Sequence, residues 1–167
     1  MNYFDSLVKK YRRKGILIDT NLLIGLLVGT LGPIHLTNCR ATKAFTKEDF
    51  FLLKSFVEQF ETIISTPHIL TEVSNLAGRL PESLTENFRS VFRLVIEKLA
   101  ENHFSALEIV RDNGFPRLGI TDTAIAMTVP GTYLVLTDEL PLYGILSTRK
   151  VDVINFNHIR SIGWGEE

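Results

Sequence analysis

Short apolar runs alternate along the chain with longer segments in which apolar residues recur every three or four positions. Each short run is typical of a buried strand in a parallel sheet, and the four runs span residues 16–18, 62–65, 133–136 and 151–156. The periodic segments predict helices over residues 3–13, 20–28, 47–60, 66–78, 84–101 and 105–112, with a shorter one from about 121. Because strands alternate with helices, we expect an α/β fold with a mainly parallel sheet and helices on both faces.

Capping signals mark two of the predicted helix starts. Thr46 is followed three positions later by Asp49, which is typical of a reciprocal capping pair. Thr66 precedes Pro67, a capping hydroxyl followed by proline at the first helical position. Glycine, proline and mixed polar residues fill positions 29–46, so we expect an irregular insertion there.

The length and composition indicate one globular domain. The 167 residues are 45% hydrophobic and 22% charged, which excludes a disordered tail or a fibre. We expect a single domain over residues 1–167, with a core over about 15–156 and an irregular or helical insertion over about 29–60. The net charge is −1, so no overall basic field exists to attract nucleic acid. The one dense basic run, residues 9–14, either contacts RNA or forms a solvated helix face.

Cysteine content and hydropathy bear on the cellular location. Cys39 is the one cysteine in the sequence and cannot form an intramolecular disulfide, which favours a reducing compartment. The most apolar segment, residues 22–34, is shorter than the roughly 20 residues of a membrane span and contains three glycines and a proline. The N-terminus lacks the apolar stretch of a secretion signal. We therefore expect a cytoplasmic protein that makes no contact with membranes.

Acidic residues gather where the predicted strands end. Asp19 directly follows the first strand, and Asp138 follows the third with one residue between. Asp122 opens a helix, and Glu72 lies in the second turn of the helix after the second strand. Each acid alone is also explained as a turn, cap or surface residue. Because carboxylates at one sheet edge repel one another, the combination favours a shared pocket that binds Mg²⁺ or Mn²⁺ through oxygen ligands.

Four segments of the chain form an ordered set of motifs. They are ILIDTNLL over residues 16–23, TP at 66–67 with LTEVSNL over 70–76, ITDTAIA over 120–126, and LVLTD over 134–138. In this order they resemble the PIN-domain family of ribonucleases, over about residues 15–156. The resemblance implies a three-layer α/β/α PIN-like fold and hydrolysis of RNA phosphodiester bonds that depends on Mg²⁺ or Mn²⁺.

The resemblance also implies roles for particular acids. The family's first acid corresponds to Asp19, its helical glutamate to Glu72 and its third acid to Asp122, all as catalytic and metal-binding residues. The fourth acid is Asp138 or Glu139, and Asp138 is favoured because it lies nearer to the strand end. The insertion lengthens the gap between Asp19 and Glu72 relative to compact toxin-like members, which leaves the subtype open.

Three uncharged residues beside these acids are candidates for binding a substrate phosphate or metal-bound water. They are Thr20, Asn21 and Thr137. Backbone N–H groups at a helix start would assist such binding. Ordinary helix capping explains these residues equally well.

Two other functions are compatible with parts of the pattern. Asp19-Thr20-Asn21 after an apolar strand resembles the nucleophile motif of haloacid-dehalogenase-type phosphatases. Asn21 stands where that family has a second aspartate, and no lysine occurs between Glu101 and Asp138. The other alternative is a catalytically inactive PIN-like module that binds RNA or protein.

The expected partners follow from the resemblance and from the helix patterns. RNA is the expected substrate, and an antitoxin protein is a possible partner if the chain is the toxin of a toxin–antitoxin pair. Stripes of Phe and Leu in the helices predicted over 47–60 and 84–101 exceed what one small sheet covers. We therefore expect a homodimer that uses one of these helices, unless the insertion over 29–46 covers the surplus.

Overall fold

Five parallel strands form the centre of the part of the chain that the computed structural model describes, residues 2–163. The strands are β1 (Ile16–Ile18), β2 (Ile63–Ser65), β3 (Ala100–Glu101), β4 (Leu134–Thr137) and β5 (Val153–Asn155). Their order in the sheet is β3-β2-β1-β4-β5. Every neighbouring pair is parallel, so all the strands end at one edge, here called the carboxyl edge.

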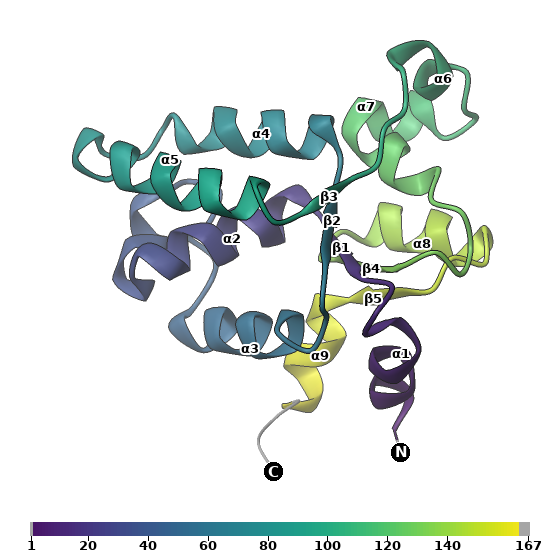
Figure 1. Ribbon diagram of the computed structural model, residues 1–167, viewed down its shortest axis with the longest axis horizontal. Helices are drawn as coiled ribbons and strands as arrows, with labels where there is room; N and C mark the ends of the chain where they lie inside the picture. The colour runs from purple at the N-terminus through teal and green to yellow at the C-terminus, as the bar shows by residue number, and fades with distance from the viewer. Residues whose placement is uncertain (1, 164–167) are drawn as a thin grey trace.

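Helices cover both faces of this sheet. They are α1 (Tyr3–Tyr11), α2 (Thr20–Leu31), the 3-10 helix η1 (Pro33–Asn38), α3 (Lys47–Val57), α4 (Pro67–Ala77), α5 (Glu82–Ile96), α6 (Ala106–Val110), α7 (Phe115–Ala126), α8 (Leu140–Thr148) and α9 (Phe156–Ile162). Figure 1 shows α2 to α5 on one side of the sheet and α1 and α6 to α8 on the other. The predicted α/β class, with three layers around a parallel sheet, is confirmed.

Helix α2 is the central helix of one outer layer and contacts α3, α4 and α5. It begins where predicted, because Asp19 caps its first turn through a hydrogen bond from the Leu22 backbone N–H. It also continues to Leu31, beyond the predicted end. Gly25 and Gly29 are one turn apart on the face that meets the Phe45 and Phe50 rings, so they admit aromatic side chains close to the helix backbone.

The predicted helix starts at Thr46 and Thr66 are confirmed. The Thr46 hydroxyl accepts a hydrogen bond from the Asp49 N–H, and the Asp49 carboxylate accepts one from the Thr46 N–H. The Thr66 hydroxyl accepts a hydrogen bond from the Ile69 N–H at the start of α4. Local capping chemistry therefore fixed these boundaries.

The helix predicted over 84–101 is too long. Helix α5 ends at Ile96, and the chain then turns and extends as β3, where Ala100 pairs with Ile64 and Glu101 with Ser65 of β2. Both β3 residues are exposed, so no apolar run reveals this strand in the sequence. Edge-strand pairing decided its position, because pairing needs backbone groups and no particular side chain.

The predicted strand over 151–156 is also shorter than expected. Its last residue, Asn155, accepts a hydrogen bond from the Asn157 N–H and thereby begins α9 at Phe156. The insertion expected over 29–46 as irregular contains the end of α2 and the 3-10 helix η1. Helices α8 and α9 were not predicted.

A kink divides α7. Gly119 has φ 74° and ψ −172°, a conformation that only glycine adopts readily, and the residues on either side are helical. The second helical segment therefore begins at about Ile120, close to the predicted start. The kink brings a new helix start, with Asp122 in its first turn, to the carboxyl edge.

Within residues 2–163, no helix combines the length and apolar character needed to cross a bilayer. The Phe and Leu stripes that led to the homodimer prediction are largely covered inside the chain. The rings of Phe50, Phe56 and Phe88 are almost fully buried. Exposed apolar side chains remain at Phe51 on α3 and Leu94 on α5, and the homodimer stays a prediction that rests on them.

Candidate functional site

An acidic pocket of about 200 Å³ lies at the carboxyl edge of the sheet. Its walls come from the start of α2, the middle of α4, the kinked part of α7 and the turn between β4 and α8. The lining residues are Asp19, Thr20, Asn21, Glu72, Leu118, Ile120, Thr121, Asp122 and Glu139. The structure therefore brings Asp19, Glu72 and Asp122 together, and the fourth carboxylate in the wall is Glu139.

Asp19 is the most buried acid of the pocket, with 3% of the residue exposed. Its backbone N–H donates to the Leu136 carbonyl, which holds it between the ends of β1 and β4. One carboxylate oxygen accepts from the Leu22 N–H at 3.0 Å, and the other accepts from the Asp138 N–H at 3.0 Å. Asp19 is therefore both the cap of α2 and the attachment point of the β4–α8 turn.

Polar side chains contact two of the other acids, Glu72 and Glu139. The Thr20 hydroxyl lies 3.5 Å from Glu72 Oε2, and Asn21 Nδ2 donates to Glu139 Oε1 at 3.2 Å. Thr137 is fully buried, and its hydroxyl accepts from the Glu139 N–H at 3.0 Å. Of the three candidates for substrate contact, Thr20 and Asn21 line the pocket and Thr137 does not. The buried Thr137 hydroxyl contacts the Glu139 N–H and the Asp19 carboxylate instead.

Burial, together with crowding, raises the pKa values of Asp19, Asp122 and Glu139. Burial, followed by repulsion from Glu139 and Glu72, raises the pKa of Asp122 to about 7. Burial and then repulsion from Asp138 raise the pKa of Glu139, and a hydrogen bond from Asp122 opposes that shift. The carboxyl groups of Asp122 and Glu139 therefore interact directly, and the pKa of each depends on the charge of the other.

Burial also raises the pKa of Asp19 well above its usual range, and the charge of Asp138 adds to the effect. Hydrogen bonds from the Thr137 hydroxyl and from the backbone N–H groups of Leu22 and Asp138 favour the ionised form and limit the shift. The site thus contains several carboxyl groups that repel one another, and the described residues that line it include no Lys, Arg or His.

Asp138 and Glu139 occupy different surroundings. Glu139 lines the pocket, whereas Asp138 is not among the lining residues. The Asp138 residue as a whole is half-buried, and its Oδ1 atom is fully buried without a hydrogen-bond partner. Its charge still acts on Asp19, Asp122 and Glu139. The sequence left these two acids as alternatives because their order along the chain does not show which one faces the pocket.

The donor set has the chemistry of a hard divalent cation site. The charged side chains that line the pocket are all carboxylates, whose oxygens suit Mg²⁺ and Mn²⁺, and a cation would offset the repulsion that adds to burial in raising the pKa of Asp122. Asp138 Oδ1 offers a further oxygen that lacks a partner. Within residues 2–163, no three Asp, Glu, His or Cys side chains are already arranged to hold a metal ion. The residue types therefore fit a cation, whereas the side-chain positions do not form a closed coordination shell.

A second pocket, of about 520 Å³, adjoins the acidic pocket along α4. It shares Glu72, Ile120 and Thr121 with the acidic pocket and extends to Pro67, His68, Thr71 and Asn75. Apolar atoms form most of its surface. The second pocket therefore lies next to the acids, on the exposed side of α4.

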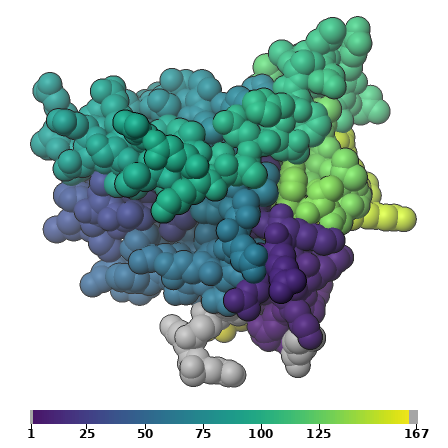
Figure 2. Space-filling view, viewed as in Figure 1, coloured from purple at the N-terminus to yellow at the C-terminus, as the bar shows by residue number. Residues whose placement is uncertain are grey.

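The basic run on and after α1 lies away from the acidic pocket. Lys10 Nζ pairs with Asp152 Oδ2 at 2.6 Å, and Lys14 Nζ donates to the Gly131 carbonyl at 2.9 Å. Asp152 and Gly131 both precede strands, so α1 lies at the edge where the strands begin. In Figures 1 and 2, α1 is at the bottom of the molecule and α7 is near the top. Lys10 and Lys14 therefore connect α1 and the residue stretch after it to the starts of the strands, and no residue of the basic run is among those that line the acidic pocket.

Comparison with known proteins gives no match among family models, curated proteins or solved structures. Any functional conclusion therefore depends on this chain's own residues.

Proposed function

We propose that the protein is a PIN-like endoribonuclease that uses Mg²⁺ or Mn²⁺ to hydrolyse RNA phosphodiester bonds. The observation that supports this function most directly is the pocket at the carboxyl edge, where Asp19, Glu72, Asp122 and Glu139 line a single cavity. In open parallel sheets, ligands bind at this edge. Clustered carboxylates with raised pKa values are typical of sites that bind divalent cations or transfer protons.

The acids have distinct roles in this proposal. Asp19 and Asp122 would hold the cation, with Glu139 or Asp138 completing the set and Glu72 binding through water. A cation bound there would lower the pKa of water and stabilise charge on the phosphate. Asn21 and Thr20 keep the carboxylates of Glu139 and Glu72 turned toward the cavity. The adjoining pocket along α4 offers RNA a path beside the acids.

Asp19→Asn is expected to remove cleavage of RNA by the purified protein in Mn²⁺. Asn retains one hydrogen-bond acceptor for α2 but lacks the negative charge, so a fall of about 10³-fold is expected, equivalent to roughly 4 kcal/mol of transition-state stabilisation. Cleavage of a fluorescent single-stranded RNA, with and without EDTA, measures the effect. Glu86→Gln on the exposed side of α5 is the matched loss of a carboxylate and should cleave like wild type. Undiminished cleavage by the Asp19→Asn protein would contradict the proposal.

Divalent cations are expected to raise the melting temperature near neutral pH. At a concentration of about 100 Kd, binding stabilises the folded state by about 2.7 kcal/mol, or roughly 5–10 °C for a chain of this size. Near pH 4 the gain should be smaller, since a proton occupies Asp122 when the pH is well below its pKa of about 7 and competes with the cation. Differential scanning fluorimetry at both pH values tests this. An equal gain in an Asp19→Asn/Asp122→Asn double variant would show that the cation binds elsewhere.

A second candidate function is a PIN-like module that binds RNA or protein without cleaving it. The observation that favours it is the lack, within residues 2–163, of a preformed three-residue metal group. Fluorescence anisotropy with labelled RNA separates the two functions. Binding that is independent of Mn²⁺ and is not followed by cleavage would identify the module.

The proposed partners and location accompany the nuclease function. We propose a cytoplasmic protein, consistent with the single cysteine Cys39, which is buried and forms no disulfide. An antitoxin protein and a second copy of the chain are proposed partners. Light scattering at micromolar concentration tests the homodimer, since a mass near the 18.9 kDa of one chain would exclude it under those conditions.

A further inference from the structure

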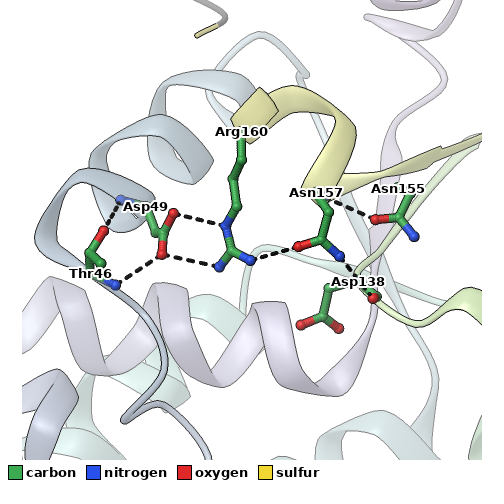
Figure 3. Close-up of polar contacts among 6 residues, drawn as sticks. All are labelled: Thr46, Asp49, Asp138, Asn155, Asn157 and Arg160. Carbon is green, nitrogen blue, oxygen red and sulfur yellow. Dashed lines mark hydrogen bonds and ion pairs between the residues drawn. The ribbon is translucent and has the colours of Figure 1, made fainter. Parts of the chain in front are cut away.

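A chain of polar contacts connects α3 and α9 to the turn that carries Asp138 and Glu139 (Figure 3). Arg160 on α9 makes two hydrogen bonds to Asp49, from Nε to Oδ1 at 2.8 Å and from Nη2 to Oδ2 at 3.1 Å. Its Nη1 atom donates to Asn157 Oδ1 at 2.7 Å. Asn157 Nδ2 then donates to the Asp138 carbonyl oxygen at 3.2 Å. These hydrogen bonds fix the orientation of the guanidinium group, and they hold the Asn157 side chain against the turn that carries Asp138 and Glu139.

Packing and helix capping fix the Arg160 and Asp49 side chains of this chain of contacts. The guanidinium group of Arg160 lies 5.2 Å from the centre of the Phe45 ring and 4.8 Å from that of Phe156. The two rings are stacked nearly parallel, with centres 6.3 Å apart, and both are buried. Asp49 is anchored in turn, because its carboxylate also caps α3. A planar cation that is held on aromatic rings and on a carboxylate fork has little freedom to rotate.

The contact with Asp138 is half of a two-sided clamp. On one side of that residue, Asn157 binds the carbonyl oxygen. On the other side, the backbone N–H donates to Asp19 Oδ2 at 3.0 Å, inside the acidic pocket. The next residue, Glu139, enters the pocket wall. Removing the Asn157 contact would free the carbonyl side of Asp138, while Asp19, Asn21 and Thr137 still contact the turn, so Glu139 would be held less firmly relative to Asp19.

We propose that Asn157 and Arg160 are positioning residues that hold the Asp138–Glu139 turn so that the pocket carboxylates can bind a divalent cation. The inference rests on the proposed metal site and extends it to α9, outside the PIN-like motifs. Neither residue lines the pocket, so their effect on the cation passes through the backbone of Asp138. Outer residues that orient ligands typically change metal affinity by 10–100-fold when replaced.

Asn157→Asp separates positioning from general stability. The new carboxylate keeps an acceptor for Arg160, and it lies in the first turn of α9, where a negative charge is favourable. It loses the N–H donor and turns an oxygen toward the Asp138 carbonyl. The melting temperature should therefore stay close to that of wild type. Mn²⁺ affinity, measured by electron paramagnetic resonance on the free protein, should fall by about tenfold.

The direction of this result excludes a simple charge effect. An additional negative charge by itself would strengthen Mn²⁺ binding, so a loss of affinity must come from geometry. Asn87→Asp on the exposed side of α5 is the matched control and should bind Mn²⁺ like wild type. Arg160→Lys is a second variant, because a point charge cannot contact both Asp49 and Asn157, and it should lower both the affinity and the melting temperature.

Cleavage assays on the same variants separate this inference from the proposed function. With saturating Mn²⁺, Asn157→Asp should lower kcat while leaving KM for RNA near the wild-type value, because Asn157 does not line the pocket along α4. Mn²⁺ affinity equal to that of wild type would overturn the positioning role and leave the nuclease function standing. A wild-type protein that binds Mn²⁺ through these residues but cuts no RNA would overturn the nuclease function and leave the positioning role standing. Failure of the wild type to bind Mn²⁺ would overturn both.

Discussion

Asp122→Asn is expected to abolish Mn²⁺-dependent cleavage of RNA and, at the same time, to stabilise the protein at neutral pH. The loss of activity should reach about 10³-fold, because the amide cannot supply the charge that a divalent cation needs. The gain in stability has a separate cause. Burial, with repulsion from Glu139 and Glu72 added to it, raises the pKa of Asp122 to about 7, and the amide has no charge that burial or these acids would disfavour. Asn Nδ2 can also donate to Glu139, as the protonated Asp122 does.

The pH dependence of this gain has a definite sign. Below the unfolded pKa near 3.8, Asp122 is protonated in both folded and unfolded chains, so Asn and Asp should be equally stable at this position. Between that value and about 7 the unfolded chain releases its proton first, and wild-type stability falls as the pH rises. Above about pH 7 the difference in stability between wild type and Asp122→Asn reaches its full size. After allowance for solvent screening of a half-buried group, it should be about 2 kcal/mol, or roughly 4–8 °C.

Thermal melts from pH 4 to pH 8 without metal measure this difference, and the cleavage assay measures the activity. Glu86→Gln again serves as control, since it removes an exposed carboxylate from α5 and should change neither quantity. A melting temperature difference that stays constant across the pH range would show that Asp122 titrates like an ordinary surface acid. An active Asp122→Asn protein would remove this residue from the proposed metal site.

Gly29→Ala is expected to destabilise the fold, although alanine is the better helix former. A methyl group at this position of α2 would lie 2.1 Å from Phe50 Cδ2 and 2.6 Å from Cε2. The Phe50 ring is 3% exposed, so it cannot move away into solvent. Such overpacking typically costs about 1–3 kcal/mol, which corresponds to a fall of roughly 2–12 °C in melting temperature.

Gly144→Ala is the matched control for Gly29→Ala, because Gly144 also lies inside a helix but is exposed and has no atom within 4 Å of an added methyl group. This change should raise the free energy of unfolding by about 0.5–1 kcal/mol. Urea denaturation of both variants measures the two effects. The double variant Gly29→Ala/Phe50→Leu should recover part of the lost stability if the ring contact is the cause. Equal effects of the two glycine substitutions would contradict the close helix–helix approach.

The sequence by itself determined the layout of the fold. Apolar runs located β1, β2, β4 and β5 to within a few residues, and capping residues such as Thr46 and Thr66 located two helix starts. It also placed Asp19 at a strand end, because a strand and the helix cap that follows it are adjacent in the chain. Each of these features depends on residues within about four positions of one another, and such patterns are visible in sequence.

Only the tertiary structure decided which groups meet. The hydrogen bond from Asn21 to Glu139 joins residues 118 positions apart, and that from Thr20 to Glu72 joins residues 52 positions apart. The β4–α8 turn that carries Glu139 into the pocket wall contacts Asp19 and Asn157, and local spacing contains no information about either contact. The exposed strand β3 was equally invisible, since backbone pairing alone defines it. The sequence thus determines which carboxylates lie at the ends of strands, and long-range packing determines which of them face one another.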